Sequence, residues 1–137
     1  SEDMMPPILF SMTKKWNTAQ ALPCYTWYFD HQLPGDENGA WHSSDLWYWF
    51  GTLPNCWRPM TDADYQLSNQ MVDYLCNFAK TGNPNGEIAN GESDLPLWED
   101  ALTSPKKAMC LDPQIGMRKP STFKMICTML TNKAVGE

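Results

Sequence analysis

Residues 24–29 form a short, almost unbroken apolar run, Cys-Tyr-Thr-Trp-Tyr-Phe. The run is too short for a typical helix and is rich in side chains that favour β-structure. Because no polar residues alternate with the apolar ones, the pattern is typical of a central strand that is buried on both faces. A strand of this kind predicts an α/β protein in which helices flank the sheet.

The chain offers few neighbours for that strand. Residues 107–111 are the one other convincing strand, and two strands cannot make a stable sheet that buries both of its faces. We therefore expect a few strands with flanking helices, in a sheet that is incomplete within this chain. Residues 1–137 are then expected to be part of a single larger domain. Exposed strand edges would also favour a homo-oligomer of the isolated chain.

The clearest helix is predicted over residues 61–82. Thr61 and Asp64 have the spacing of a capping box, and Gly82 follows the last turn. The predicted apolar stripe along this helix consists of Leu67, Met71, Tyr74, Leu75 and Phe78. Shorter helices are predicted over 8–19, 44–50 and 121–130, the second of them capped by Ser43 or Ser44 and ending at Gly51.

Two segments read as loops. Residues 31–40 are rich in Gly, Pro, Asn and Asp, which favour turns. Residues 86–105 are polar apart from Leu-Pro-Leu-Trp at 95–98, which we expect to pin this loop to a core.

Charge and composition exclude several partners. The formal net charge is -6, with only 10 Lys and Arg residues, so a nucleic-acid partner is not expected. No apolar run approaches the roughly 18–20 residues that would span a bilayer, so no membrane partner is expected. The compartment stays open.

The five cysteines are odd in number and contain no C-x-x-C pair. They indicate neither a metal site nor a complete disulfide framework, and most are expected to be buried thiols. No cofactor is expected.

The chain contains seven tryptophans. Four of them, Trp41, Trp47, Trp49 and Trp57, fall close together in the sequence. Such a cluster either packs a crowded core or lines a ligand cavity, and for any single tryptophan packing is the favoured reading.

His42 is the first candidate for chemistry. It follows the predicted strand and the 31–40 loop, and a histidine on a loop is well placed to act as a general base. A single histidine flanked by aromatic residues is nevertheless more often structural, so the position alone does not decide its role.

Four stretches around this histidine carry a specific resemblance. They are Gly-Ala-Trp-His-Ser-Ser-Asp-Leu-Trp-Tyr-Trp-Phe-Gly at 39–51, Tyr-Phe-Asp-His at 28–31, Phe-Ala-Lys-Thr-Gly-Asn-Pro-Asn at 78–85 and Leu-Pro-Leu-Trp at 95–98. Their order and sequence resemble the C-terminal segment of type-B carboxylesterases, the cholinesterase-like and para-nitrobenzyl esterase-like α/β-hydrolases. The resemblance covers about residues 4–130.

The resemblance implies that His42 is the base of a Ser-His-Glu/Asp triad that hydrolyses carboxylic esters. In α/β-hydrolases the nucleophile and the acid precede the histidine, so both are expected in the remainder of a parent esterase chain. Gly-Glu-Ser-Asp-Leu at 91–95 lacks the second glycine of the family's nucleophile motif, so Ser93 is not expected to be the nucleophile. The chain by itself is expected to be inactive.

The same resemblance implies a pocket for a small-molecule ester. Trp41 and Trp47 would contact its acyl or alcohol group, and Ser43 and Ser44 would line the pocket unless they cap the short helix. Asp45 would orient the site rather than serve as the triad acid.

His31 is expected to be structural, at the end of the strand. A metal site that pairs it with His42 has no supporting cysteine or carboxylate spacing.

Two other functions stay open. One is a noncatalytic, cholinesterase-like interaction domain that shares the fold and has lost a catalytic residue, although His42 argues against it. The other is an aromatic-rich ligand-binding module, for a carbohydrate for example, built on the clustered tryptophans.

Overall fold

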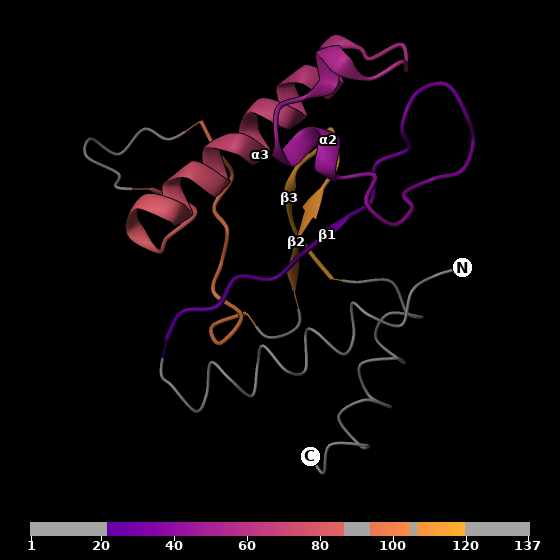
Figure 1. The fold of residues 1–137 in the computed structure, drawn as a ribbon. Coiled ribbons are helices and arrows are strands. Elements are labelled where there is room, and N and C mark those ends of the chain that lie inside the picture. The colour runs from indigo at the N-terminus through magenta and orange to yellow at the C-terminus, as the bar shows by residue number, and fades with distance from the viewer. Residues whose placement is uncertain (1–21, 87–93, 105–106, 120–137) are drawn as a thin grey trace. The chain divides into compact units, whose positions relative to one another are not determined.

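The computed structural model describes residues 22–86, 94–104 and 107–119. The helices predicted over 8–19 and 121–130 lie outside these residues, as does Ser93. In chain order the elements are β1 (Trp27–Phe29), α2 (Leu46–Trp49), a short 3-10 helix (Leu53–Asn55), α3 (Asp62–Thr81), β2 (Ala108–Leu111) and β3 (Gly116–Arg118) (Figure 1).

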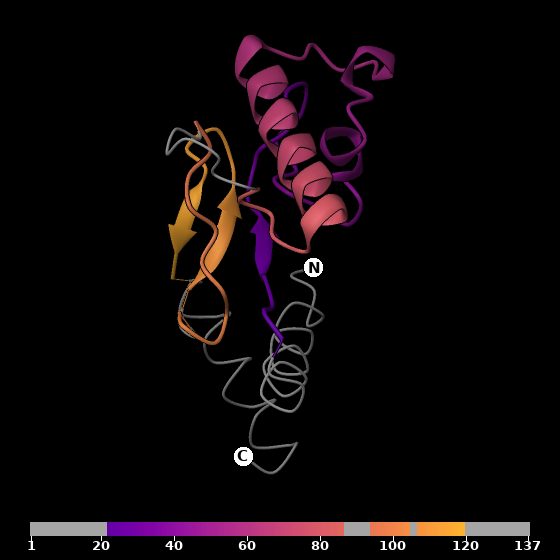
Figure 2. The same ribbon diagram turned by 90° about the vertical axis from the view of Figure 1, so that its left-hand side faces the viewer.

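The three described strands form one small sheet in the order β1-β2-β3. The backbone N–H of Met109 donates to the Thr26 carbonyl at 2.9 Å, and that of Asp30 donates to the Leu111 carbonyl at 3.2 Å. Figure 2 shows β1 and β2 running in the same direction and β3 running the opposite way. A short β2-to-β3 connection is what an antiparallel pair needs. The sheet is thus a partial α/β arrangement, as predicted.

The chain divides into two compact units. One of them, here called the helical unit, comprises Phe29–Trp98 and Cys110–Gly116 and contains both α2 and α3. The described part of the other unit includes residues 22–28, 99–104 and 107–109. There the Cys24 N–H bonds the Asp100 carboxylate and the Cys24 carbonyl accepts the Ala101 N–H.

Helix α3 begins and ends at the predicted signals. Thr61 and Asp64 form a capping box, in which each side chain accepts the backbone N–H of the other residue. At the other end Gly82 has a φ of 75° and donates its N–H to the Phe78 carbonyl at 2.8 Å. This left-handed conformation favours glycine and terminates the helix.

The apolar stripe of α3 is narrower than the sequence indicates. Leu67, Met71 and Tyr74 are buried, but Leu75 and Phe78 are exposed, with 42% and 48% of their surface accessible. Helical periodicity shows which residues share a face, yet burial also needs a partner over that face. Three of the five residues of the predicted apolar stripe are therefore buried, and these two are not.

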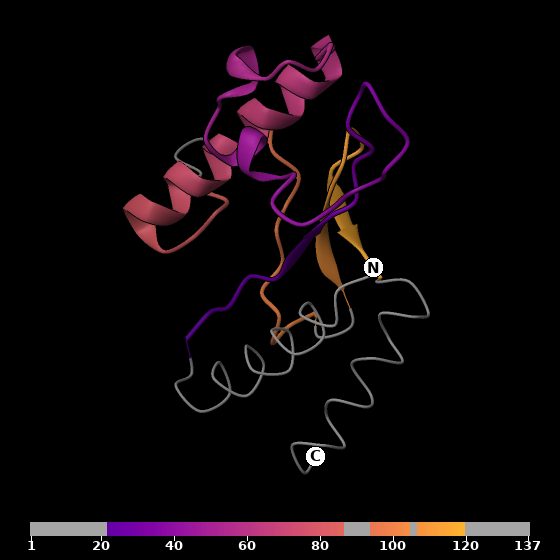
Figure 3. The same ribbon diagram turned by 45° about the vertical axis from the view of Figure 1, so that its right-hand side comes forward.

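Helix α2 packs against α3 in the helical unit (Figure 3). Tyr48 on α2 is fully buried. The remaining buried apolar residues of this unit are Leu33, Leu53, Leu67, Met71, Tyr74, Trp98, Cys110 and Leu111.

The loop after α3 returns to this core through Trp98, as predicted. The Asn85 side chain accepts a hydrogen bond from the Trp98 N–H at 2.7 Å and donates one to the Trp98 carbonyl at 3.0 Å. The Tyr74 and Trp98 rings meet edge to face, with centroids 5.2 Å apart. Trp98 is buried whereas its neighbour Leu97 is exposed, and the Tyr74 hydroxyl also holds the loop by donating to the Pro96 carbonyl at 2.5 Å.

The strand predicted over 24–29 is present only as β1, and its burial was predicted incorrectly. Trp27 is 41% exposed. Among the described strands β1 has β2 as its single strand neighbour. Strand β3 was not predicted, because it is short and contains a glycine, a residue that is depleted in strands.

Cysteine burial differs from the prediction as well. Cys110 is buried, but Cys76 is exposed and Cys24 and Cys56 are partly exposed. Cys127 lies outside the described residues. Within these residues no group of three or more His, Cys, Asp or Glu side chains could hold a metal ion. None of the described helices is long and apolar enough to cross a membrane.

Candidate functional site

His42 lies on the long loop that leads from β1 to α2, in a turn just before the helix. The residue is exposed to solvent. Its imidazole makes no hydrogen bond or ion pair with any residue of the described part of the chain. The ring is therefore accessible to groups that this part of the chain does not supply.

A compact turn holds the backbone around His42. The Ser44 N–H donates to the Trp41 carbonyl at 3.0 Å, and the Ser44 hydroxyl accepts the Trp41 N–H at 3.3 Å. Ser43 has a φ of 68°, in the left-handed region that favours glycine. The residue that follows His42 is thus held in a strained conformation by the bonds around it.

The predicted cap of the short helix is wrong. Helix α2 begins at Leu46 and its N-cap is Asp45, which makes no side-chain capping bond. The buried Ser44 cannot serve because its hydroxyl lies against the Trp41 N–H. The predicted stop is confirmed, since Gly51 follows the helix with a φ of 61°.

The Gln32 side chain holds the first half of the loop. Its amide nitrogen donates to the Asp36 carbonyl at 2.6 Å and to the Leu33 carbonyl at 2.9 Å. Its amide oxygen accepts the Gly39 N–H at 2.7 Å. One side chain therefore closes the turn-rich segment on itself.

Arg58, which lies outside the turn-rich segment in the sequence, also holds that segment through Pro34 and Asp36. Its guanidinium donates to the Pro34 carbonyl at 2.9 Å and pairs with the Asp36 carboxylate at 2.5 Å. The hydrogen bond from Arg58 holds the pKa of Asp36 below its usual range. The guanidinium also lies 4.7 Å from the ring centre of Trp57, which makes this exposed tryptophan a cation–π partner.

The two ends of the His42 loop meet at the Asp64 carboxylate. The Tyr48 hydroxyl donates to it at 2.6 Å, and the His31 Nε2 atom lies 2.7 Å from the same oxygen. Burial opposes ionisation of Asp64, but hydrogen bonds from Thr61, Tyr48 and His31 outweigh it and lower the pKa to about 2. Burial first, and the Asp64 bond second, raise the pKa of Tyr48 far above its usual range.

This cluster was not predicted from the sequence beyond the capping role of Asp64. His31 was expected to be structural, and its place beside Asp64 agrees with that expectation. The two histidines thus differ, since His31 is tied to a carboxylate and His42 is not.

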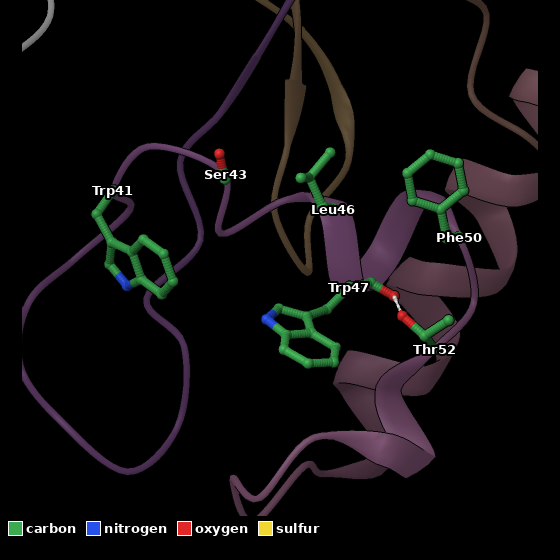
Figure 4. Close-up of a pocket in the computed structure, with 6 residues that line it drawn as sticks. All are labelled: Trp41, Ser43, Leu46, Trp47, Phe50 and Thr52. Atoms are coloured by element: carbon green, nitrogen blue, oxygen red, sulfur yellow. Dashed lines mark hydrogen bonds between the residues drawn. The ribbon is translucent and has the colours of Figure 1, made fainter.

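A pocket of about 460 Å³ opens beside the His42 turn (Figure 4). Its walls are mainly apolar, and the Thr52 hydroxyl donates to the Trp47 carbonyl at 3.5 Å. The lining residues are Trp41, Ser43, Leu46, Trp47, Phe50 and Thr52.

Of the predicted pocket residues, the structure brings Trp41, Ser43 and Trp47 together around this space. Ser44 and Asp45 do not line it. Leu46 and Phe50 were missed, although their i, i+4 spacing on a helix could have indicated a shared face.

Comparison with known proteins identifies the family of this chain. A model of the carboxylesterase family matches residues 5–128. Carboxylesterase 4A of Bos taurus is 36% identical over 82 residues, which is 56% of this chain and 14% of that protein. Bile salt-activated lipase of Homo sapiens is 32% identical over 105 residues, covering 71% of this chain and 13% of that protein.

Among solved structures, a PNB esterase is 29% identical with a TM-score of 0.57, covering 77% of this chain and 21% of the esterase. A second structure of PNB esterase gives 27% identity and a TM-score of 0.61. The fold is therefore part of an α/β-hydrolase fold. The chain belongs to the carboxylesterase family, and it spans about a seventh of the length of the two curated relatives described above.

Proposed function

We propose that the protein to which this chain belongs hydrolyses carboxylic esters with a Ser-His-Glu/Asp triad, and that His42 is its general base. The observation that carries the proposal is the state of His42, which is exposed and has no partner among the described residues of a carboxylesterase-family chain. The partner that supplies the serine and the acid is the remainder of the parent esterase chain.

The proposed chemistry of His42 follows from its imidazole side chain and its accessibility. A neutral imidazole accepts the proton of the serine hydroxyl as the serine oxygen attacks the ester carbonyl. The imidazolium then returns a proton to the leaving alcohol, and the same steps with water release the acid. The acidic partner would bond the other ring nitrogen and fix the tautomer.

The pocket beside the turn is proposed to hold the acyl or alcohol group of a small ester. Trp41 and Trp47 supply apolar walls, and Ser43 adds a hydroxyl next in sequence to His42. A volume of about 460 Å³ lies in the range of small-molecule sites. Ser44 supports this role indirectly, because it holds the Trp41 backbone.

The test is hydrolysis of p-nitrophenyl butyrate by the full-length protein and its His42→Ala variant. Loss of the general base should lower kcat by about 10³-fold or more while the protein stays folded. Asn69→Ala is the matched control, since Asn69 is exposed on α3 and should leave kcat unchanged. Fluorophosphonate labelling should slow in parallel with the loss of kcat.

Full activity in the His42→Ala variant would show that another group is the base. Absence of both turnover and labelling in the wild-type protein would favour the noncatalytic interaction domain instead. The 137-residue chain alone is expected to show neither turnover nor labelling, because it carries one triad member. Turnover by the chain alone would place a serine nucleophile within it and contradict the proposal.

A further inference from the structure

Asp64 makes more hydrogen bonds than a capping residue needs. It is 2% exposed, and one carboxylate oxygen accepts the Thr61 N–H at 2.8 Å and the Thr61 hydroxyl at 2.6 Å. That oxygen completes the helix cap. The other oxygen is left to bind residues from elsewhere in the fold.

The second oxygen joins His31 and Tyr48. The Tyr48 hydroxyl lies 2.6 Å from it and the His31 Nε2 atom 2.7 Å. With its low pKa Asp64 is ionised at neutral pH, and an ionised carboxylate only accepts hydrogen bonds. His31 Nε2 therefore carries a proton, and both residues donate to the same oxygen atom.

These two donors come from opposite ends of the loop that carries His42. His31 lies two residues after β1, and Tyr48 is on α2, after the His42 turn. Their rings also pack edge to face with centroids 5.6 Å apart, and Phe29 packs on Tyr48 at 5.1 Å. The loop is thus closed at its base by one buried carboxylate.

A third contact holds the α2 end of the loop to α3. The buried Ser68 hydroxyl donates to the Tyr48 carbonyl at 2.9 Å, so the backbone and the side chain of Tyr48 are both fixed to α3. The turn around His42 has its own bonds, from Ser44 to Trp41 and from Leu46 to Ser43. These bonds shape the turn, and its place in the fold depends on how its ends are held.

We propose that Asp64 is a positioning residue for His42, because its bonds to His31 and Tyr48 set where the loop presents the imidazole. This inference rests on the proposed function. A base that is displaced by even 1 Å from the nucleophile loses much of its effect. Asp64 would act through the loop and touch neither substrate nor reacting atoms.

The experiment separates the two oxygens of Asp64 in the full-length protein. Tyr48→Phe removes one donor to the loop-facing oxygen, whereas Thr61→Val removes one hydroxyl donor to the capping oxygen. At an assay temperature well below the Tm of the variant, Tyr48→Phe should lower kcat for p-nitrophenyl butyrate about tenfold with little change in KM. Each variant loses one hydrogen bond to Asp64, so Thr61→Val should lower Tm about as much as Tyr48→Phe does. Thr61→Val should nevertheless leave kcat within about twofold of wild type.

Amide hydrogen exchange gives a readout that does not depend on esterase activity. Tyr48→Phe should speed exchange at the Ser44 and Leu46 amides, and Thr61→Val should not. If exchange responds in this way but His42→Ala retains activity, the proposed function fails and Asp64 still holds the loop.

Three results would overturn the positioning role. Exchange at Ser44 and Leu46 could be unchanged by Tyr48→Phe. Exchange could rise while kcat stays at the wild-type value in an enzyme that needs His42. Alternatively, kcat could fall in both variants in proportion to their loss of Tm, which would make Asp64 a stabilising residue only.

Discussion

His31 Nε2 and the Asp64 carboxylate lie 2.7 Å apart, and both groups are largely buried. This pair separates the two histidines of the chain by environment. His31 Nε2 is hydrogen-bonded to Asp64, whereas the ring of His42 has no partner among the described residues. His31 is held by this pair and is mostly buried, whereas His42 is exposed, and His42 is therefore the residue that we propose as the base.

Asp64 should govern part of the acid stability of the protein. Its pKa in the folded state is about 2, below the ordinary 3.8, so its contribution is complete above about pH 4 and is lost as the pH falls toward 2. The free energy of unfolding should drop by on the order of 2 kcal/mol across this window. Urea unfolding between pH 2 and pH 5 measures it.

The control for that titration is Asp64→Asn, which cannot lose charge. The variant should be less stable at pH 5, and its stability should decline less with acid, because it lacks the Asp64 carboxylate. Some decline should remain, since Asp36 and Glu99, whose pKa values are also lowered, are present in both proteins. Equal slopes in the variant and the wild type would assign the acid sensitivity to other carboxylates.

The sequence predicted the local half of this cluster and missed the distant half. Thr61 and Asp64 are three residues apart, and their capping box follows from residue type and spacing. The bonds to His31 and Tyr48 join residues 33 and 16 positions from Asp64, and no local pattern specifies them. Tertiary packing decides which distant donors reach a spare carboxylate oxygen.

Local features were also predicted better than distant contacts for burial and for the candidate site. The position of His42 on a loop after a strand was predicted, since turn residues and a strand run are local signals. Exposure of Leu75 and Phe78 was not, because periodicity cannot tell which faces gain a partner. Ser44 was misassigned as a cap because its actual partner, the Trp41 N–H, depends on the fold of the turn.

Trp98 should contribute more to stability than any exposed tryptophan. It is 4% exposed and packs edge to face on Tyr74. The Asn85 side chain bonds both its backbone N–H and its carbonyl. Trp98→Ala should lower the free energy of unfolding by about 3–5 kcal/mol. Trp57→Ala is the matched control, because Trp57 is 77% exposed and its loss should cost under about 1 kcal/mol. Similar losses in thermal unfolding would contradict this assignment.

Gly82 should be required for its backbone conformation alone. Its φ is 75°, and a Cβ atom placed there would meet nothing within 4 Å. Gly82→Ala should therefore cost about 1 kcal/mol from conformational strain without any clash. Gly82→Asn should cost less, since asparagine tolerates the left-handed region better than alanine. Thermal unfolding of the two variants tests this order, and an equal cost for both would point to a lost contact instead.

Ser43→Gly should stabilise the turn that follows His42. Ser43 has a φ of 68°, and its hydroxyl has no hydrogen-bond partner in the described part of the chain. Relief of strain of roughly 1–2 kcal/mol is partly offset by the greater flexibility of glycine in the unfolded chain, which leaves a gain of about 0.5–1 kcal/mol. Ser44→Ala is the control in the opposite direction, because it removes the acceptor of the Trp41 N–H and should cost about 1 kcal/mol. Chemical denaturation of both variants measures the difference, and a destabilised Ser43→Gly protein would mean that the Ser43 hydroxyl makes a contact that compensates for its strained backbone.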